Sequence, residues 1–72
     1  MNIDDFARRL RECMKAKGYT GYRLAKEMGI DRRRLLCWTK GRNYPQLYCL
    51  GMLCNILDVS ADYLLFGKEH NE

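Results

Sequence analysis

Three consecutive arginines, Arg32, Arg33 and Arg34, are the residues of this chain best suited to recognition chemistry. A guanidinium group carries a rigid fork of N–H donors that fits phosphate oxygens and the O6 and N7 atoms of guanine. The arginines directly follow Asp31, whose carboxylate can cap a helix that begins at Arg32. Positive charge at a helix N-terminus opposes the helix dipole. The arrangement therefore indicates an anionic partner.

The segment that positions the arginines predicts two short helices joined by a tight turn. Gly29 suits the left-handed residue that ends a helix, and Asp31 starts the next one two residues later. Apolar residues recur at helical spacing within residues 24–28 and again within residues 35–38, so each helix buries one face. The arginines point away from these faces. This pattern is typical of a helix-turn-helix that binds DNA.

Charge is unevenly distributed along the 72 residues, whose net charge is +4. Residues 29–44 contain five Lys or Arg and one Asp, whereas residues 58–72 are acidic. A basic cluster favours a nucleic-acid partner, although a solvated charged face is the alternative. The length predicts one small domain over residues 1–67, and we expect the charged tail at residues 68–72 to be disordered.

The cysteines lack the spacing of a metal site or a disulfide framework, because no C-x-x-C pair occurs and the only histidine is His70 in the tail. They are Cys13, Cys37, Cys49 and Cys54. No signal peptide and no apolar run long enough to cross a membrane is present. We expect free thiols in a reducing cytoplasm, with no metal, cofactor, membrane or small-molecule ligand. Cys54 is expected in the core, and Cys37 lies one turn after Arg33, where it can meet DNA.

The rest of the chain shows helix signals and no strand signals. A first helix of about fourteen residues is predicted to end at Gly18, and Thr20 caps the next. Pro45 marks the start of a fourth helix, with an apolar stripe of Leu47, Leu50, Leu53, Cys54 and Leu57. A last short helix covers Ala61–Phe66. The sequence predicts an all-α fold of five helices.

Over residues 6–67 the sequence resembles the phage Cro/repressor-type helix-turn-helix domains, known also as XRE-like domains. The matching segments are KGYT (residues 17–20), LAKEMGI (residues 24–30), W-x-x-G (residues 38–41), Pro45 and LDVSADYLLFG (residues 57–67). The resemblance implies a compact lambda-repressor-like bundle in which the second and third helices form the helix-turn-helix.

The resemblance also implies that the third helix lies in the major groove of double-stranded DNA. Arg32, Arg33 and Cys37 match base-reading positions of the family, and arginine there favours guanine in each half-site. Leu36 stands at a usually polar position, where it meets a thymine methyl, packs on a partner or is merely tolerated. Arg34 is expected on a phosphate. The alternative is that one of the three arginines merely faces solvent.

Further phosphate contacts are implied at the rim of the motif. The matching residues are Thr20, Tyr22, Lys40, Arg42, Asn43 and Tyr44. Each has a plain structural alternative; for example, Thr20 can serve only as a cap, and Tyr44 can simply cover Pro45 and the end of the third helix. Two departures from the family matter here: Gly21 replaces a common glutamine that binds phosphate, and Asp58 replaces the usual glycine after the fourth helix.

Members of the family usually bind palindromic operators as dimers. Tyr63, Leu65 and Phe66 are candidates for a homodimer surface, together with Tyr48 and Met52, although Leu65 and Phe66 can instead close the core. We expect a sequence-specific transcriptional regulator, a repressor of phage, mobile-element or bacterial origin. The alternative is a protein-interaction module, such as an antitoxin or a helix-turn-helix domain that binds a partner protein. An enzyme is disfavoured, because no nucleophile with an orienting base is evident.

Overall fold

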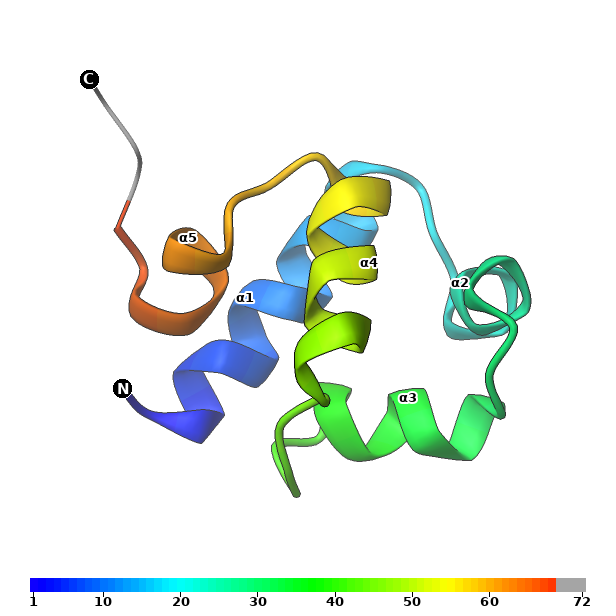
Figure 1. Ribbon diagram of the computed structural model, residues 1–72, viewed down its shortest axis with the longest axis horizontal. Helices are drawn as coiled ribbons and strands as arrows, with labels where there is room; N and C mark the ends of the chain where they lie inside the picture. Colours follow the sequence, from blue (N-terminus) through cyan, green and yellow to red (C-terminus); the bar gives the residue numbers. More distant parts are fainter. Residues whose placement is uncertain (69–72) are drawn as a thin grey trace.

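The computed structural model describes residues 1–68. Within these residues the chain forms five helices and no strand (Figure 1). The helices are α1 (Ile3–Ala16), α2 (Gly21–Met28), α3 (Arg32–Thr39), α4 (Leu47–Leu57) and α5 (Ala61–Phe66). The predicted all-α fold of five helices is therefore confirmed. Of the predicted tail, only Lys68 belongs to the described residues, and it is exposed.

Side-chain caps start four of the helices. Asn2 accepts from the backbone N–H groups of Asp4 and Asp5 at the start of α1, and Thr20, Asp31 and Ser60 cap α2, α3 and α5 in the same way. Each cap satisfies N–H groups that have no partner inside the helix. Since the caps and the apolar spacing are local signals, the helix limits lie close to those expected from the sequence.

The helices enclose one apolar core. Its fully buried large side chains come from all five helices: Phe6, Leu10, Leu24, Leu35, Leu53, Leu57 and Leu64. The predicted stripe of α4 is wrong at its start, because Leu47 is 83% exposed, whereas Cys49 is fully buried. Cys54 is only half-buried against the core. The face that α4 buries is thus set by Cys49, Leu50, Leu53 and Leu57.

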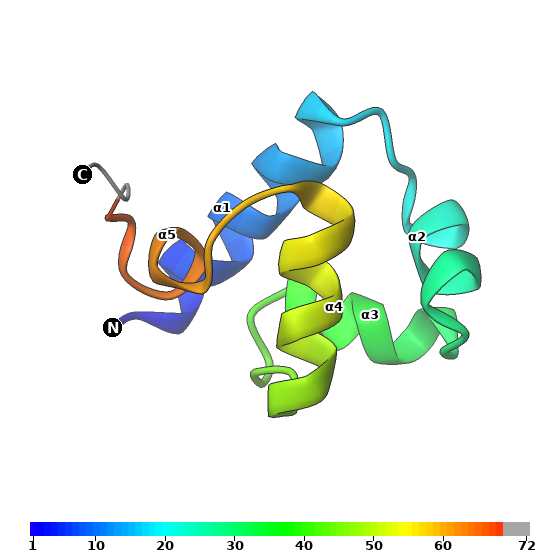
Figure 2. The same ribbon diagram turned by 45° about the horizontal axis from the view of Figure 1, so that its top comes forward.

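The helix-turn-helix lies at one end of the molecule. α3 packs against α2 and α1, while α5 packs against α1 and α4. Figures 1 and 2 show α5 beside the first turns of α1, on the opposite side of the molecule from α2. α3 runs along the lower edge in Figure 1, and the other helices lie above it. Its outer side is left open.

The cysteines are free thiols, and burial raises the pKa of Cys13 and of Cys54. Within residues 1–68, no three His, Cys, Asp or Glu side chains are grouped as a metal site would require. No helix in that part of the chain has the length and apolar character needed to span a bilayer. His70 lies outside the described residues.

Candidate nucleic-acid interface

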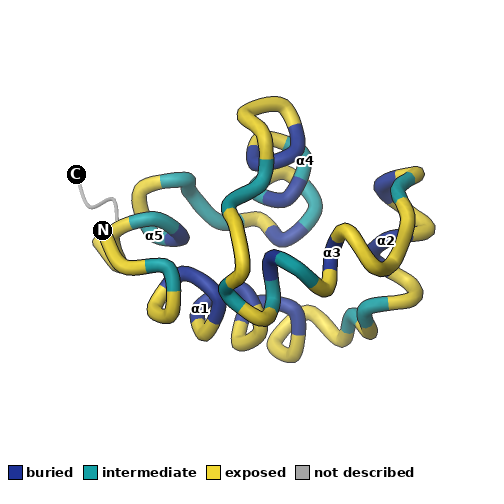
Figure 3. Tube along the Cα trace, turned by 90° about the horizontal axis from the view of Figure 1, so that it is seen from below, coloured by how far each residue is buried: buried dark blue, intermediate teal, exposed yellow. Residues whose placement is uncertain are grey.

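The start of α3 is the most exposed part of the motif. Asp31, Arg32, Arg33 and Arg34 are all exposed, and Leu35 is the first residue of the helix to be buried. Figure 3, which views the molecule from below, shows this change from exposed to buried chain along α3. Leu35 and Trp38 anchor the helix in the core. The arginines therefore project from a helix that is fixed on its other side.

The turn between α2 and α3 is closed by backbone hydrogen bonds. Gly29 has φ 73°, and its N–H donates to the carbonyl of Lys26. The N–H of Ile30 donates to the carbonyl of Ala25 at 3.0 Å, which completes a Schellman-type helix end. Asp31 then caps α3 through a 2.8 Å bond from the N–H of Arg33. These bonds define the angle between the two helices.

The side chain of Arg33 also turns back to Asp31. Its Nη2 lies 3.1 Å from Oδ2 of Asp31, and its Nε lies 3.4 Å from Oδ1. The side chain of Arg33 is nevertheless 88% exposed. The Arg33 guanidinium lowers the pKa of the Asp31 carboxyl, with help from the Arg33 backbone N–H, and Asp31 raises the pKa of Arg33. The carboxylate that caps α3 and the guanidinium of Arg33 therefore form one ion pair.

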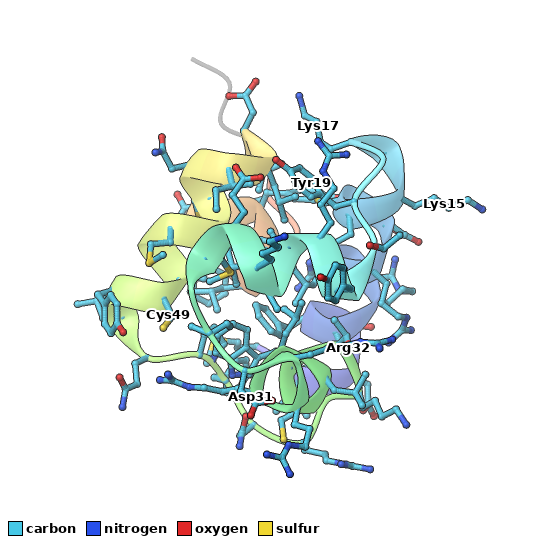
Figure 4. The ribbon with its side chains drawn as sticks, turned by 90° about the vertical axis from the view of Figure 1, so that its right-hand side faces the viewer. Lys15, Lys17, Tyr19, Asp31, Arg32 and Cys49 are labelled. Atoms are coloured by element: carbon cyan, nitrogen blue, oxygen red, sulfur yellow. The ribbon has the colours of Figure 1, made fainter. Side chains whose placement is uncertain are left out.

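Arg32 lies on the flank of α3 that faces α1 and α2. It lines a hollow of about 350 Å³ together with Arg11, Lys15, Gly21 and other residues. A Cβ on Gly21 would lie 3.8 Å from Nε of Arg32, so the arginine occupies the space beside this glycine. Figure 4 looks onto α2, with Asp31 and Arg32 at the start of α3 below it. This flank carries three cations.

Arg34 lies on the opposite flank, toward the loop between α3 and α4. Its Nη2 is 3.5 Å from Oε1 of Gln46, and its guanidinium carbon is 6.0 Å from the centre of the Trp38 ring. It lines a second hollow of about 260 Å³ with Asn43, Tyr44 and others. The structure thus brings together three predicted phosphate-binding residues. Because successive helical residues diverge by about 100°, the three arginines reach three different sides of α3.

The outer face of α3 lies between these flanks. Helical spacing places Arg33, Leu36, Cys37 and Lys40 on this face. Leu36 is 38% exposed, Cys37 is half-buried against the core, and Lys40 is exposed at the end of the helix. A stripe of one arginine, two small or apolar groups and one lysine is therefore available to a partner.

The other predicted contact residues surround α3. Thr20 is exposed and caps α2, its Oγ1 accepting from the N–H of Arg23 at 3.1 Å. Tyr22 is 62% exposed, with Nζ of Lys26 5.9 Å from its ring centre. Arg42 is exposed after α3. Tyr44 packs its ring 5.2 Å from that of Phe6, so it has a structural role whether or not it binds phosphate.

Sequence reasoning missed two residues and one ion pair of this region. Arg11 donates from Nη1 to the carbonyl of Thr39 at 2.6 Å and ties α1 to the end of α3. Gln46 holds Arg34 from twelve positions away, for which no local signal exists. Asp31 was expected as a cap, but its pairing with Arg33 was not. The adjacency of an acidic cap and arginines was the available signal.

The predicted dimer residues differ in exposure. Tyr63 and Leu65 are half-buried against the core, whereas Phe66 is 50% exposed. On α4 the predicted candidate Tyr48 is 63% exposed, and the structure adds Leu47, which is 83% exposed. Exposed apolar side chains on this uncharged helix are a further candidate surface for association.

Comparison with known proteins supports the same interpretation. Residues 9–65 match the model of the Cro/C1-type HTH DNA-binding domain. Over 62 residues the chain is 42% identical to the SPbeta prophage-derived uncharacterized HTH-type transcriptional regulator YonR of Bacillus subtilis (strain 168). Over 67 residues it is 40% identical to the uncharacterized HTH-type transcriptional regulator YqaE of the same strain.

The two alignments cover 86% and 93% of this chain but only 57% and 58% of the relatives. The chain therefore spans little more than half the length of these relatives. The matched residues run from Arg9 within α1 to Leu65 within α5, so they include the whole helix-turn-helix and α4. The resemblance expected from the sequence is confirmed, and the chain belongs to the Cro/C1-type helix-turn-helix DNA-binding domain family.

Proposed function

We propose that the protein is a sequence-specific transcriptional repressor that inserts α3 into the major groove of double-stranded DNA. Arg32 and Arg33 read base edges near the start of the helix, and Leu36 and Cys37 follow one turn later. The observation that carries the proposal is the exposed, cation-rich start of α3 on a core-anchored, capped helix-turn-helix. Family membership supports it independently. The role is one of binding rather than catalysis, in a reducing cytoplasm.

Phosphate contacts hold the two sides of the groove. On one flank of α3 they come from Arg34, Asn43 and Tyr44, which surround one hollow, with Lys40 and Arg42 nearby in sequence. On the other flank they come from Thr20 and Tyr22 at the start of α2. Contacts of this kind set the register of a protein on DNA without reading its sequence.

The repressor acts as a homodimer on a palindromic operator with guanine in each half-site. A single short recognition helix reads few base pairs, so two copies one helical turn apart supply specificity. Phe66 remains a candidate for the dimer surface with Tyr63 and Leu65. On the outer face of α4, the exposure of Leu47 extends the candidate surface that includes Tyr48. One relative is named as prophage-derived, which favours an origin in a phage or mobile element.

The first test is selection of binding sites from random double-stranded DNA, followed by titration of the selected and a scrambled duplex at two salt concentrations. We expect a palindrome with guanines and a log–log salt slope of about −0.9 per neutralised phosphate. Failure to enrich any sequence, with no salt-sensitive binding, would contradict DNA recognition. It would favour the alternative, a module that holds a protein partner through exposed apolar residues such as Leu36 and Tyr48.

The roles proposed for Arg33 and Arg42 predict different effects on DNA binding when each arginine is replaced by alanine. Arg33→Ala should reduce preference at one base pair by about 1–3 kcal/mol, because a bidentate contact to guanine is lost. Arg42→Ala should weaken binding to all duplexes alike and make the salt slope shallower by about one unit. Titration of both variants against the selected site and its single-base variants measures both effects. Equal losses on specific and scrambled DNA for Arg33→Ala would reduce Arg33 to a phosphate contact.

A further inference from the structure

The ion pair between Asp31 and Arg33 leaves part of the guanidinium free. Asp31 engages Nε and Nη2 of Arg33, at 3.4 Å and 3.1 Å. These two atoms form one edge of the planar guanidinium. The neighbouring edge, made by Nη1 and the second hydrogen of Nη2, forms no hydrogen bond within the described residues. Two parallel donors on that edge match the O6 and N7 acceptors of guanine.

An acidic residue at this position needs an explanation. Asp31 lies at the end of α3 that is proposed to enter the groove, where a carboxylate is repelled by the phosphates. A serine or asparagine would cap the helix as well. Asp31 differs from them in carrying a charge, and that charge engages Arg33. Neither neighbouring arginine contacts it, because Arg32 lies beside Gly21 and Arg34 lies beside Gln46.

We propose that Asp31 is a positioning residue for base recognition: it holds one edge of the Arg33 guanidinium and presents the other edge to guanine. The inference rests on the proposed function and adds to it a determinant of specificity that does not touch DNA bases. A free arginine must be ordered when it binds, whereas Arg33 is already oriented by a bidentate contact. The same pair neutralises the carboxylate that would otherwise face the DNA.

The test variant is Asp31→Asn, which keeps an N-cap acceptor and removes the charge. Discrimination between the selected operator and its single-base variants at the guanine read by Arg33 should fall about 2- to 12-fold, since arginine ordering is then an added cost of the specific complex. Affinity for scrambled DNA should rise, because one negative charge near the phosphates is gone. A purely structural role for Asp31 would lower both affinities together and leave their ratio unchanged.

Three comparisons make the test specific. Asp62→Asn changes the net charge by the same amount at an exposed residue of α5, on the far side of the molecule, and should leave the discrimination ratio unchanged. In an Arg33→Ala background, Asp31→Asn should no longer alter discrimination, as a double-mutant cycle requires for coupled residues. Asp31→Ser, which also keeps a cap, should repeat the effect if the asparagine variant folds poorly.

The outcomes separate this inference from the proposed function. If the wild-type chain selects an operator but Asp31→Asn and Asp31→Ser keep its discrimination, the positioning role is wrong and sequence-specific binding stands. An equal effect of Asp31→Asn with and without Arg33 would also overturn it. If the wild-type chain selects no sequence, the proposed function itself fails, and the role inferred for Asp31 fails with it.

Discussion

Arg9→Ala should strongly lower the free energy of unfolding of this chain, because it truncates a buried charged side chain. Arg9 is a cation on α1 but only 8% exposed, and its Nε donates to the carbonyl of Leu64 at 3.0 Å. That carbonyl belongs to the last turn of α5, where the negative end of the helix dipole lies. The guanidinium also lies against Gly67, whose added Cβ would be 3.1 Å from Nη1. Arg9 therefore attaches α5 to α1.

The expected loss follows from two contributions. A hydrogen bond that involves a charged group contributes about 1.5–3 kcal/mol. The two methylenes removed beyond Cβ contribute about 0.8 kcal/mol each when buried. The cost of burying the guanidinium offsets part of this sum, which leaves about 2–4 kcal/mol. A chain of this length has a total stability of about 4–11 kcal/mol, so the midpoint of thermal unfolding should fall by about 10–30 °C.

The assay is urea and thermal unfolding followed by circular dichroism, with Arg8→Ala as the matched control. Arg8 is the preceding residue of the same helix, but its side chain is 50% exposed and pairs with Asp5 and Glu12 at the surface. Its loss should cost less than about 1 kcal/mol. If the two variants unfold at the same urea concentration, the contact between Arg9 and α5 does not stabilise the fold, and the reasoning is refuted.

Three further changes test other parts of the structure. Leu53→Ala, at a fully buried position, should lower the free energy of unfolding in urea by about 2–5 kcal/mol. Leu47→Ala, at an exposed position, should leave the stability of the monomer unchanged and weaken only self-association measured by sedimentation. Equal losses of stability in the two variants would contradict the orientation of α4. Asp58 has φ 57°, so Asp58→Gly should raise the free energy of unfolding by about 0.5–1 kcal/mol, and a loss of thermal stability would contradict this. The hydrogen bonds from Arg33 lower the folded-state pKa of Asp31, so its stabilisation is present above the ordinary aspartate pKa and is lost as pH falls through the lower folded value. Asp31→Asn should remove this part of the acid sensitivity, and unchanged acid unfolding curves would refute it.

Local signals in the sequence determined the elements of this fold. Thr20, Asp31 and Ser60 cap helices because their side chains reach N–H groups two or three residues away. Gly29 and Gly67 end helices because glycine adopts positive φ without a Cβ clash. These interactions lie within a few residues of one another, so their spacing in the chain predicts them. The same spacing carried the resemblance that the family match confirms.

The sequence determines less well which face of a helix is buried in the core. On α4 both Leu47 and Cys49 are apolar, and periodicity favoured Leu47 for the core. Packing of the whole bundle exposes Leu47 and buries Cys49. A helix with no charged side chains has no clearly polar face. Its rotation therefore follows from the shapes of its neighbours, which only the assembled structure supplies.

The candidate interface also has features that follow from the sequence and features that only the folded structure supplies. The sequence by itself determined that three arginines follow a capped turn, because the cap, the glycine and the arginines are adjacent in the chain. Only the tertiary structure decided that Arg32 lies beside Gly21 and Arg34 beside Gln46, whereas Arg33 pairs with Asp31 two residues away. Long side chains have many rotamers of similar energy, and the choice among them depends on partners brought close by folding. The buried contact of Arg9, whose acceptor is 55 residues away, has the same origin.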